Sequence, residues 1–429
     1  MEMANRAAGN RGVRPPDGAA IRRMPPAGGR RRVAWKGSFP GVAAVFVLFL
    51  AASSAPSPLY VIYQRQWQFT AWVLTVVFAL YVFGLLGSLL VVGALSDHLG
   101  RRPVLAAAIA LETVALGLFL TAGNVLVLSA ARVLQGIATG AATTTLSATL
   151  VDLDPSGGRA GVVTSVAPPT GLALGALGSG VLVEFGPAPT RLVYALLLGG
   201  MAVAAVVVAL LPETSLRRPG AVASLRPRIA MPAHLRADIL PVVPAMVACW
   251  ALAGMYLSLG PSVAAELLGL RSHLVGGIVV TLLTGTGALA ISLLRSRTAS
   301  WLLAPSSVLL GLGTLISLTG TAEDLIWLSA VGTVVAGIGF GASVLATFGT
   351  FARVARPHER SAAFALANII CYLGNSVPAV LGGIAVTTLG LRTATEIYAL
   401  AITVITFSAF ALRLHQLRAR RNAVTAPCG

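Results

Sequence analysis

Between two long apolar blocks the chain reads Gly93-Ala-Leu-Ser-Asp97-His-Leu-Gly100-Arg-Arg-Pro103. This loop gathers an acid, two bases and two glycines, while the residues on both sides of it are almost all apolar. Of the 429 residues in the chain, 56% are hydrophobic and only 10% are charged. A soluble chain of this length would need a much larger charged surface. The composition therefore excludes an ordinary soluble protein.

The apolar residues form uninterrupted blocks that are long enough to cross a membrane. Four stretches contain no charged residue at all: those between Lys36 and Arg65, Arg159 and Glu184, Asp238 and Glu266, and Asp324 and Arg353. A membrane-spanning helix needs roughly 20 residues, and helices satisfy their own backbone hydrogen bonds in lipid. We therefore predict an all-α membrane protein with twelve transmembrane helices. Their expected ranges are 39–61, 71–95, 103–122, 124–151, 160–184, 190–211, 239–262, 273–294, 301–320, 325–351, 361–389 and 393–413.

The chain also repeats itself at an offset of about 200 residues. Leu128-Ser-Ala recurs as Leu328-Ser-Ala, and Gly136-Ile-Ala-Thr-Gly-Ala recurs as Gly337-Ile-Gly-Phe-Gly-Ala. These segments lie in the fourth and tenth expected spans, so the repeat predicts two pseudo-symmetric six-helix bundles in parallel orientation. The expected organisation is a basic tail (1–38), a first bundle (39–213), a cytoplasmic linker (214–238), a second bundle (239–413) and a basic tail (414–429).

The charge distribution indicates how the chain is oriented. The net charge is +17, and 26 of the 31 basic residues fall in segments that share one side of the membrane with the N-terminus. Because basic residues are retained in the cytoplasm, both termini are expected there. The basic residues suit anionic lipids better than nucleic acid. Arg30-Arg-Arg before an apolar run also permits a cleavable export signal, which would leave eleven spans.

The loop from Gly93 to Pro103 resembles the cytoplasmic signature of the major facilitator superfamily, G-x-L-[A/S]-D-[R/K]-x-G-R-[R/K]. Only His98 departs from this pattern. An ordinary positive-inside loop would explain the arginines but not the glycines and the acid. The resemblance implies a conformational latch on the cytoplasmic side, formed by Gly93, Asp97, Gly100, Arg101, Arg102, Asp152 and Asp154. It also implies that Asp97 approaches the N-terminal amides of span eleven, at residues 361–364, in an outward-facing state.

Span four contains Arg132-Val-Leu-Gln135-Gly136-Ile-Ala-Thr-Gly140, which looks like a second signature of the same superfamily. In the family its arginine is associated with proton coupling, and an intramembrane arginine should face a partner or a cavity. The alternative is an arginine that reaches back to the interface. Span five, with Gly171, Gly175 and Gly178, is similar to the antiporter signature, although Ala176 replaces its proline. Such small residues are equally typical of helix packing.

One acid lies deep in the apolar blocks, and we expect it to act together with Arg132. Glu112 precedes the turn near Gly123 by about as many residues as Arg132 follows it, so the two should lie at similar depth. The resulting hypothesis is a proton-coupling pair in which Glu112 takes a proton when Arg132 moves away. The alternative is a peripheral Glu112 that makes one polar contact or faces lipid.

Transport of a small molecule driven by protons is the function that these features favour. Proline-containing breaks in spans one and seven predict a moving gate, and Tyr60, Trp250 and Tyr256 are candidates to line a cavity between the bundles. The apolar composition favours export of hydrophobic or amphiphilic compounds; uptake of a metabolite and a non-transporting receptor or scaffold remain alternatives. The three cysteines show no metal-ligand spacing, and no motif indicates an enzyme or a cofactor. We expect a monomer in a bacterial inner membrane.

Overall fold

The computed structural model describes residues 37–92, 95–154, 158–215, 219, 236–270, 272–356 and 359–425, and its regular elements there are helices. Gly93 of the expected latch lies outside these ranges, as do nearly all of the first tail and of the linker. The expected boundaries of the tails and bundles therefore stay predictions.

The helices follow the order of the expected spans. In the first half they are α1 (Ser38–Ser54), α2 (Tyr60–Trp67), α3 (Ala71–Val92), α4 (Leu95–Leu99), α5 (Arg101–Thr121), α6 (Val125–Leu153), α7 (Gly158–Phe185) and α8 (Leu192–Leu210). The second half contains α10 (Arg236–Ile239), a 3₁₀ turn (Leu240–Val242), α11 (Val243–Ser258), α12 (Gly260–Glu266), α13 (His273–Leu294), α14 (Ala299–Ala322), α15 (Ile326–Val354), α16 (Arg360–Leu389) and α17 (Leu391–Thr425).

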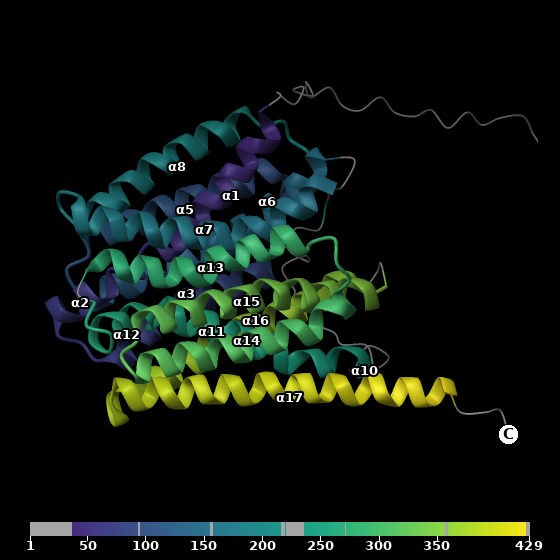
Figure 1. The fold of residues 1–429 in the computed structure, drawn as a ribbon. Coiled ribbons are helices and arrows are strands. Elements are labelled where there is room, and N and C mark those ends of the chain that lie inside the picture. Colours follow the sequence, from purple (N-terminus) through teal and green to yellow (C-terminus); the bar gives the residue numbers. More distant parts are fainter. Residues whose placement is uncertain are drawn as a thin grey trace, which may run out of the picture.

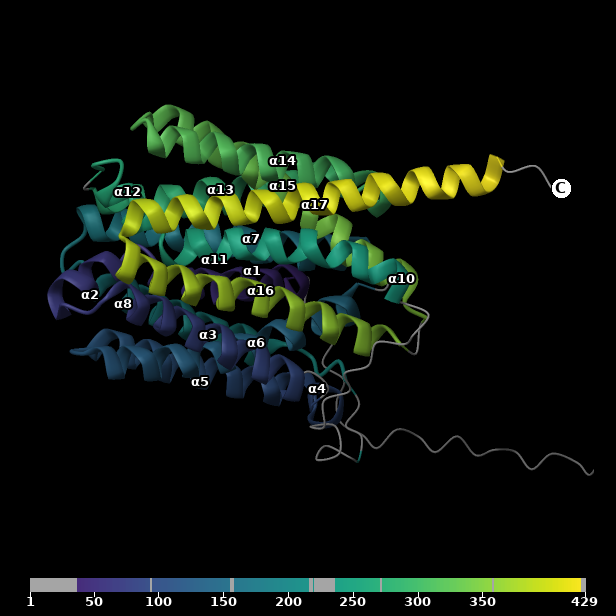
Figure 2. The same ribbon diagram turned by 90° about the horizontal axis from the view of Figure 1, so that it is seen from below.

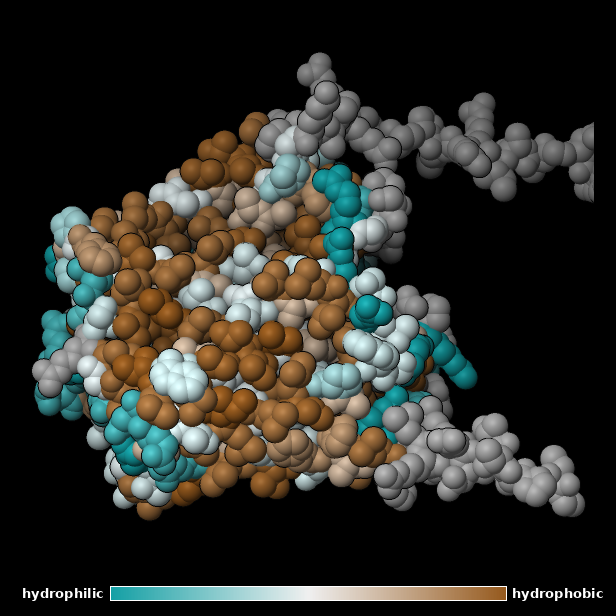
Figure 3. All heavy atoms as spheres, viewed as in Figure 1, coloured by the Kyte–Doolittle hydropathy of each residue, from teal (hydrophilic) through white to brown (hydrophobic). Residues whose placement is uncertain are grey.

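The number and composition of the long helices confirm the twelve-span fold. Within the described residues, eleven helices are long and apolar enough to cross a membrane, and the shorter apolar helix α1 supplies the twelfth span. Apolar side chains cover the flank of the molecule, whereas polar ones gather at its two ends (Figure 3). This distribution is expected when lipid surrounds the helices and water covers both ends.

The two halves lie against one another as two layers (Figure 1). Figure 2 shows α16 of the second half beside α3 of the first, and Figure 1 shows α13 beside α7; both pairs are packed together. We call the end with α4 and α10 the α4 end, and the opposite end, with α2 and α12, the α12 end (Figure 2).

Spans one and seven, expected over 39–61 and 239–262, are broken helices, as their prolines predict. Helix α1 ends at Ser54, because Pro56 and Pro58 cannot donate backbone hydrogen bonds, and α2 begins only at Tyr60. In span seven only Leu259 separates α11 from α12. The apolar span of the last helix is Leu391–Leu414, close to the expected 393–413, and the helix α17 itself continues to Thr425.

Contacts toward the α12 end join the halves. The Glu184 carboxylate accepts a hydrogen bond from the backbone N–H of His273 at 2.8 Å, and Thr387 Oγ1 accepts one from the Trp72 N–H at 3.3 Å. Nearer the middle, the Thr281 hydroxyl donates to the carbonyl of Ala173 at 3.0 Å. The two halves are therefore closed against one another at the α12 end.

Candidate functional site

The break between α1 and α2 leaves carbonyl groups without their usual helical donors. In an unbroken helix the carbonyls of Ala52 and Ser54 would accept from residues 56 and 58, but both of these are proline. The Ser54 carbonyl accepts instead from the N–H of Ser57 at 3.0 Å. Because Ser57 is engaged there, the carbonyl of Ser53 also loses its donor. Buried carbonyls of this kind need partners from elsewhere.

Side chains of α6 and α7 supply those partners. Arg132 Nη1 donates to the Ser53 carbonyl at 2.9 Å, and Gln135 Nε2 donates to the Ala52 carbonyl at 3.1 Å. The Ser179 hydroxyl donates to the carbonyl of Ala55 at 2.6 Å. The backbone of the break is thus held by Arg132 and Gln135 of the same helix, one turn apart.

Arg132 lies inside the first bundle, and only 1% of its surface is exposed. Nη1 also donates to Gln135 Oε1 at 2.7 Å, and Nη2 donates to the Tyr60 hydroxyl. Its guanidinium faces the rings of Tyr60, Tyr81 and Phe119, with centroids 5.2–5.7 Å away. Arg132 therefore does not reach back to the interface, which was the alternative that the sequence left open.

Glu112 of α5 belongs to the same cluster through Gln135. Gln135 Nε2 donates to Glu112 Oε1 at 3.0 Å, while Glu112 Oε2 has no hydrogen-bond partner. Glu112 is fully buried, so it does not face lipid. The carboxyl group of Glu112 and the guanidinium of Arg132 are joined through the amide of Gln135, without a direct ion pair between these two described residues. Gln135, expected from the second signature only as a helix-packing or antiporter-like residue, is the bridge between them.

The described part of the latch loop surrounds Arg101 with acceptors. Its guanidinium contacts Asp97 Oδ1 at 2.6 Å and Asp152 Oδ2 at 3.2 Å, and it donates to the Ser96 hydroxyl at 2.6 Å. Asp154, the second candidate partner, accepts from the backbone N–H groups of Arg159 and Ala160 at 2.8 and 2.9 Å. Asp154 thus caps the N-terminus of α7.

Glu213 is a member of this loop cluster that the sequence analysis missed. Its carboxylate oxygens accept from the N–H groups of Arg101 at 2.7 Å and Arg102 at 3.2 Å, at the start of α5. Gly100 precedes α5 with φ of 101°, and a Cβ there would lie 2.7 Å from Glu213 Oε2. Arg102 donates to the Val208 and Ala209 carbonyls at the end of α8. The sequence signal for such a partner was the glycine before α5. Glycine has no side chain to cap the helix, so the first N–H groups need an acceptor from elsewhere.

The glycines singled out in α6 and α7 allow close helix contacts. A Cβ on Gly136 or Gly140 would collide with the backbone of α3, and one on Gly171 or Gly175 would collide with α1. A Cβ on Gly178 would meet nothing within 4 Å. Four of these five glycines thus bring α1 and α3 against the helices that carry Arg132 and Ser179.

The three aromatic candidates for a cavity between the halves occupy different places. Tyr60 is buried in the first half against Arg132. Trp250 packs in the second half between Phe340 and Tyr372, with ring centroids 6.5 and 5.5 Å away. Tyr256 hydrogen-bonds to Ser317 and Thr333 inside the second half. Neither Tyr60 nor Tyr256 therefore lies between the halves in this structure, because each has its polar partners within its own bundle.

A family model described as Major Facilitator Superfamily matches residues 42–379. The chain belongs to this superfamily. Its members are membrane transporters, so the superfamily assignment makes this chain a multi-pass transporter. None of the curated protein sequences matches it. Within the described residues no group of three or more His, Cys, Asp or Glu side chains is placed to hold a metal ion.

Solved structures support the same fold at low sequence identity. The human organic anion transporter MFSD10 (TETRAN) superposes with a TM-score of 0.61 at 16% identity, covering 87% of this chain and 98% of that one. A point mutant of the nucleoside transporter NupG gives a TM-score of 0.67 at 13% identity, with 87% and 99% covered. At such identities the likeness concerns the fold and not the substrate.

Proposed function

We propose that this superfamily member is a proton-coupled exporter of hydrophobic or amphiphilic small molecules that works by alternating access. The observation that carries the proposal is the buried chain of hydrogen bonds from Glu112 through Gln135 to Arg132. A buried acid linked to a buried base in a membrane span is costly to maintain without a function. The unpartnered oxygen Oε2 of Glu112 is the atom at which a proton would be held.

This chain of hydrogen bonds can couple proton binding to movement because it ends on the backbone of a broken helix. Arg132 and Gln135 donate to carbonyls in the last turn of α1, and Arg132 also binds Tyr60 at the start of α2. A rearrangement of the α1–α2 break would release donors of Arg132. Those donors would then be free to pair with Glu112 once it has lost its proton. The deprotonated Glu112 carboxylate and the carbonyls of the helix break thus compete for the same guanidinium.

The proposed orientation places the α4 end in the cytoplasm, in line with the basic residues on that side. With the halves held together at the α12 end by Glu184–His273 and Trp72–Thr387, the protein is then closed toward the outer side of the membrane in this structure. Asp97 is paired with Arg101 here and its side chain is half exposed. An Asp97 that binds the start of α16 is therefore proposed for the outward-facing state alone.

Uptake of a metabolite is the second candidate, because the solved relatives are described by what they transport and not by an export direction. A scaffold that binds without transporting is the third. Proteoliposomes with an imposed ΔpH, challenged with a compound panel, separate the three. Collapse of ΔpH by dyes and drugs supports the exporter, collapse by nutrients supports uptake, and no response to any compound supports the scaffold.

The coupling site is tested with Glu112→Gln, which keeps the shape of the side chain and removes its titration. We expect uphill export to be lost while exchange of substrate down its own gradient continues without pH dependence. Glu396→Gln is the matched control, since Glu396 lies in α17, outside the Arg132 cluster. Uphill export by Glu112→Gln with a normal proton stoichiometry would show that the proton site is elsewhere.

A further inference from the structure

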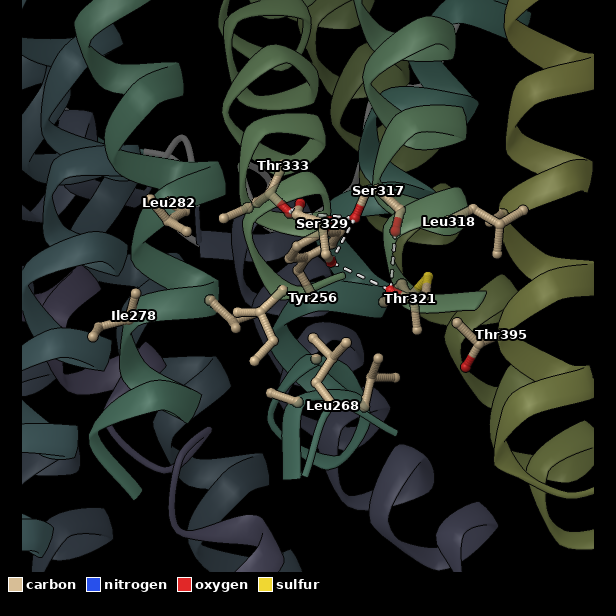
Figure 4. Close-up of a pocket in the computed structure, with 18 of the residues that line it drawn as sticks. Tyr256, Leu268, Ile278, Leu282, Ser317, Leu318, Thr321, Ser329, Thr333 and Thr395 are labelled. Carbon is tan, nitrogen blue, oxygen red and sulfur yellow. Dashed lines mark hydrogen bonds between the residues drawn. The ribbon is translucent and has the colours of Figure 1, made fainter. Parts of the chain in front are cut away.

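The second half contains a cavity of about 130 Å³ that takes no part in the Arg132 cluster. Its lining residues come from α11, α12, α13, α14, α15 and α17 and from the segment after α12 (Figure 4). Ile278 of α13 and Ile326 of α15 line it and are 36% and 46% exposed. Because Ile326 opens α15 and Leu268 follows α12, the mouth of the cavity lies toward the α12 end.

Five hydroxyl groups meet on one side of this largely apolar cavity (Figure 4). They belong to Tyr256, Ser317, Thr321, Ser329 and Thr333. The Tyr256 hydroxyl lies 2.8 Å from Thr333 Oγ1 and 3.2 Å from Ser317 Oγ. Ser329 Oγ lies 3.3 Å from Thr321 Oγ1 and 3.4 Å from Ser317 Oγ. Among the described residues that line the cavity, none is charged.

The hydroxyl cluster has more acceptor sites than protons. Each hydroxyl has one proton to donate and two lone pairs that accept. Thr333 and Thr321 donate to the backbone carbonyls of Ser329 and Ser317, at 2.9 and 3.0 Å. The remaining protons have acceptors within the cluster. Lone pairs are therefore left over, and they suit a ligand that donates a hydrogen bond.

We propose that this cavity is a binding site for a small, neutral, largely apolar molecule with one hydrogen-bond donor, such as a phenol. Its volume matches the cavities of roughly 150 Å³ that accept benzene. A charged ligand would lose its hydration without a counter-charge. The surplus lone pairs of the cluster select a hydroxyl or N–H group over a purely apolar ring. The site depends only on residues of the second half and does not require the proposed proton coupling.

Binding to the purified full-length protein in nanodiscs tests the site directly, with 4-fluorophenol and fluorobenzene followed by ¹⁹F NMR. Empty nanodiscs correct for partition into lipid. We expect saturable binding of 4-fluorophenol and binding of fluorobenzene that is at least about tenfold weaker, because fluorobenzene has no proton to donate to the surplus lone pairs of the cluster. Equal affinities, or no saturable binding of either compound, would overturn the proposal. The latter result would leave water as the occupant.

Two variants and a control locate the binding. Tyr256→Phe should weaken 4-fluorophenol binding by roughly fivefold, the effect of losing one hydrogen bond, and should leave fluorobenzene unaffected. Tyr398→Phe is the control, since Tyr398 is buried in the same half, donates to the Ala251 carbonyl at 2.9 Å and does not line the cavity. Ala330→Leu should fill the cavity and abolish binding. Equal losses in both tyrosine variants, or full binding to a folded Ala330→Leu protein, would contradict the assignment.

These measurements are independent of transport, because no gradient is present in them. Failure of the Glu112→Gln test would remove the proposed coupling site and leave the cavity in place. Failure of the fluorophenol test would remove the cavity site and leave the proton hypothesis untouched.

Discussion

The two halves of the molecule carry different polar groups at corresponding positions. Arg132 of α6 and Glu112 of α5 lie near the broken helix α1 in the first half. In the second half, six spans later, α14, α15 and the broken helix α11 surround a cluster of uncharged hydroxyls. The repeat that aligns Leu128 with Leu328 places Gly332 opposite Arg132. A Cβ on Gly332 would collide with the backbone of α14 at Ser317, so that position leaves no room for a side chain.

The chemistry of the two helix breaks explains this difference. Two prolines interrupt span one, and its freed carbonyls recruit Arg132, Gln135 and Ser179. At the break in span seven the backbone hydrogen bonds continue, from the Leu259 N–H to Met255 and from the Val263 N–H to Leu259, at 2.8 and 2.9 Å. The second break therefore requires no charged donor. Its polar neighbours are free to line a cavity instead.

The largest difference between the two halves is expected when the charged donor Arg132 is removed. Arg132→Ala would leave the Ser53 carbonyl and Gln135 Oε1 without their donor and an acid without its linked base. We expect a loss of roughly 3–5 kcal/mol of stability and no measurable uphill transport. Thr333→Ala, at the corresponding level of the second half, should cost only about 1 kcal/mol. Thermal unfolding in nanodiscs measures both, and equal losses would refute the asymmetry.

A second experiment isolates the bridge between the charges. Gln135→Leu would disconnect Glu112 from Arg132 and leave the Ala52 carbonyl unpaired, at a cost of about 1–3 kcal/mol. The pH profile of transport should flatten, since the charge of Glu112 would no longer be transmitted to Arg132. Asn375→Leu is the matched control in the second half, because Asn375 Nδ2 donates to the Trp250 carbonyl at 3.2 Å. An unchanged pH profile in Gln135→Leu would show that the bridge plays no part in coupling.

The sequence was sufficient to predict the span architecture, because hydrophobic blocks and their length dictate it directly. It also directed attention to Arg132 and Glu112, since ionisable groups are rare in these blocks, and their role in proton coupling stays a prediction. The bridging role of Gln135 was not predicted, because two of its three hydrogen bonds reach other helices, α1 and α5. Packing between helices, which hydropathy does not encode, fixes such contacts.

The same limit explains why the contacts of Glu213 and of the aromatic candidates were not predicted from the sequence. Glu213 lies more than 100 residues from Arg101, and no local pattern links the loop after α8 to the start of α5. Tyr256 was expected between the halves because an aromatic residue in span seven suits a central cavity. The direction of the Tyr256 side chain depends on the rotation of α11 about its axis. In the structure this side chain points toward α14 and α15.

A third prediction concerns the loop that only the first half carries. Asp97→Asn would remove the ion pair with Arg101 and the anion expected at the start of α16 in the outward-facing state. The population should shift toward the inward-facing state, and transport should slow several-fold while membrane insertion stays normal. Accessibility of single cysteines introduced at the two ends measures the shift. Unchanged transport together with unchanged accessibility on both sides would remove the latch role.

The smallest expected effect on stability concerns the start of α5 in the first half and of the corresponding helix α14 in the second. Glu213 places its carboxylate on the first N–H groups of α5, where the helix dipole favours an anion. The corresponding helix α14 begins after Thr298, whose side chain makes no capping hydrogen bond. Glu213→Gln removes the charge and one acceptor oxygen, so it should lower stability by about 0.5 kcal/mol at low salt. Thr298→Ala should have no measurable effect, because no capping bond is lost.

The salt dependence of stability distinguishes the contribution of the Glu213 charge from that of its hydrogen bonds. An exposed charge at a helix end is screened by ions. The difference in stability between the Glu213→Gln variant and the unaltered protein should therefore shrink when the salt concentration rises to about 1 M. A difference that persists at high salt would assign the effect to the lost hydrogen bond with Arg101 or Arg102. A cost of Thr298→Ala equal to that of Glu213→Gln would contradict the view that charge stabilises the start of α5 but not the start of α14.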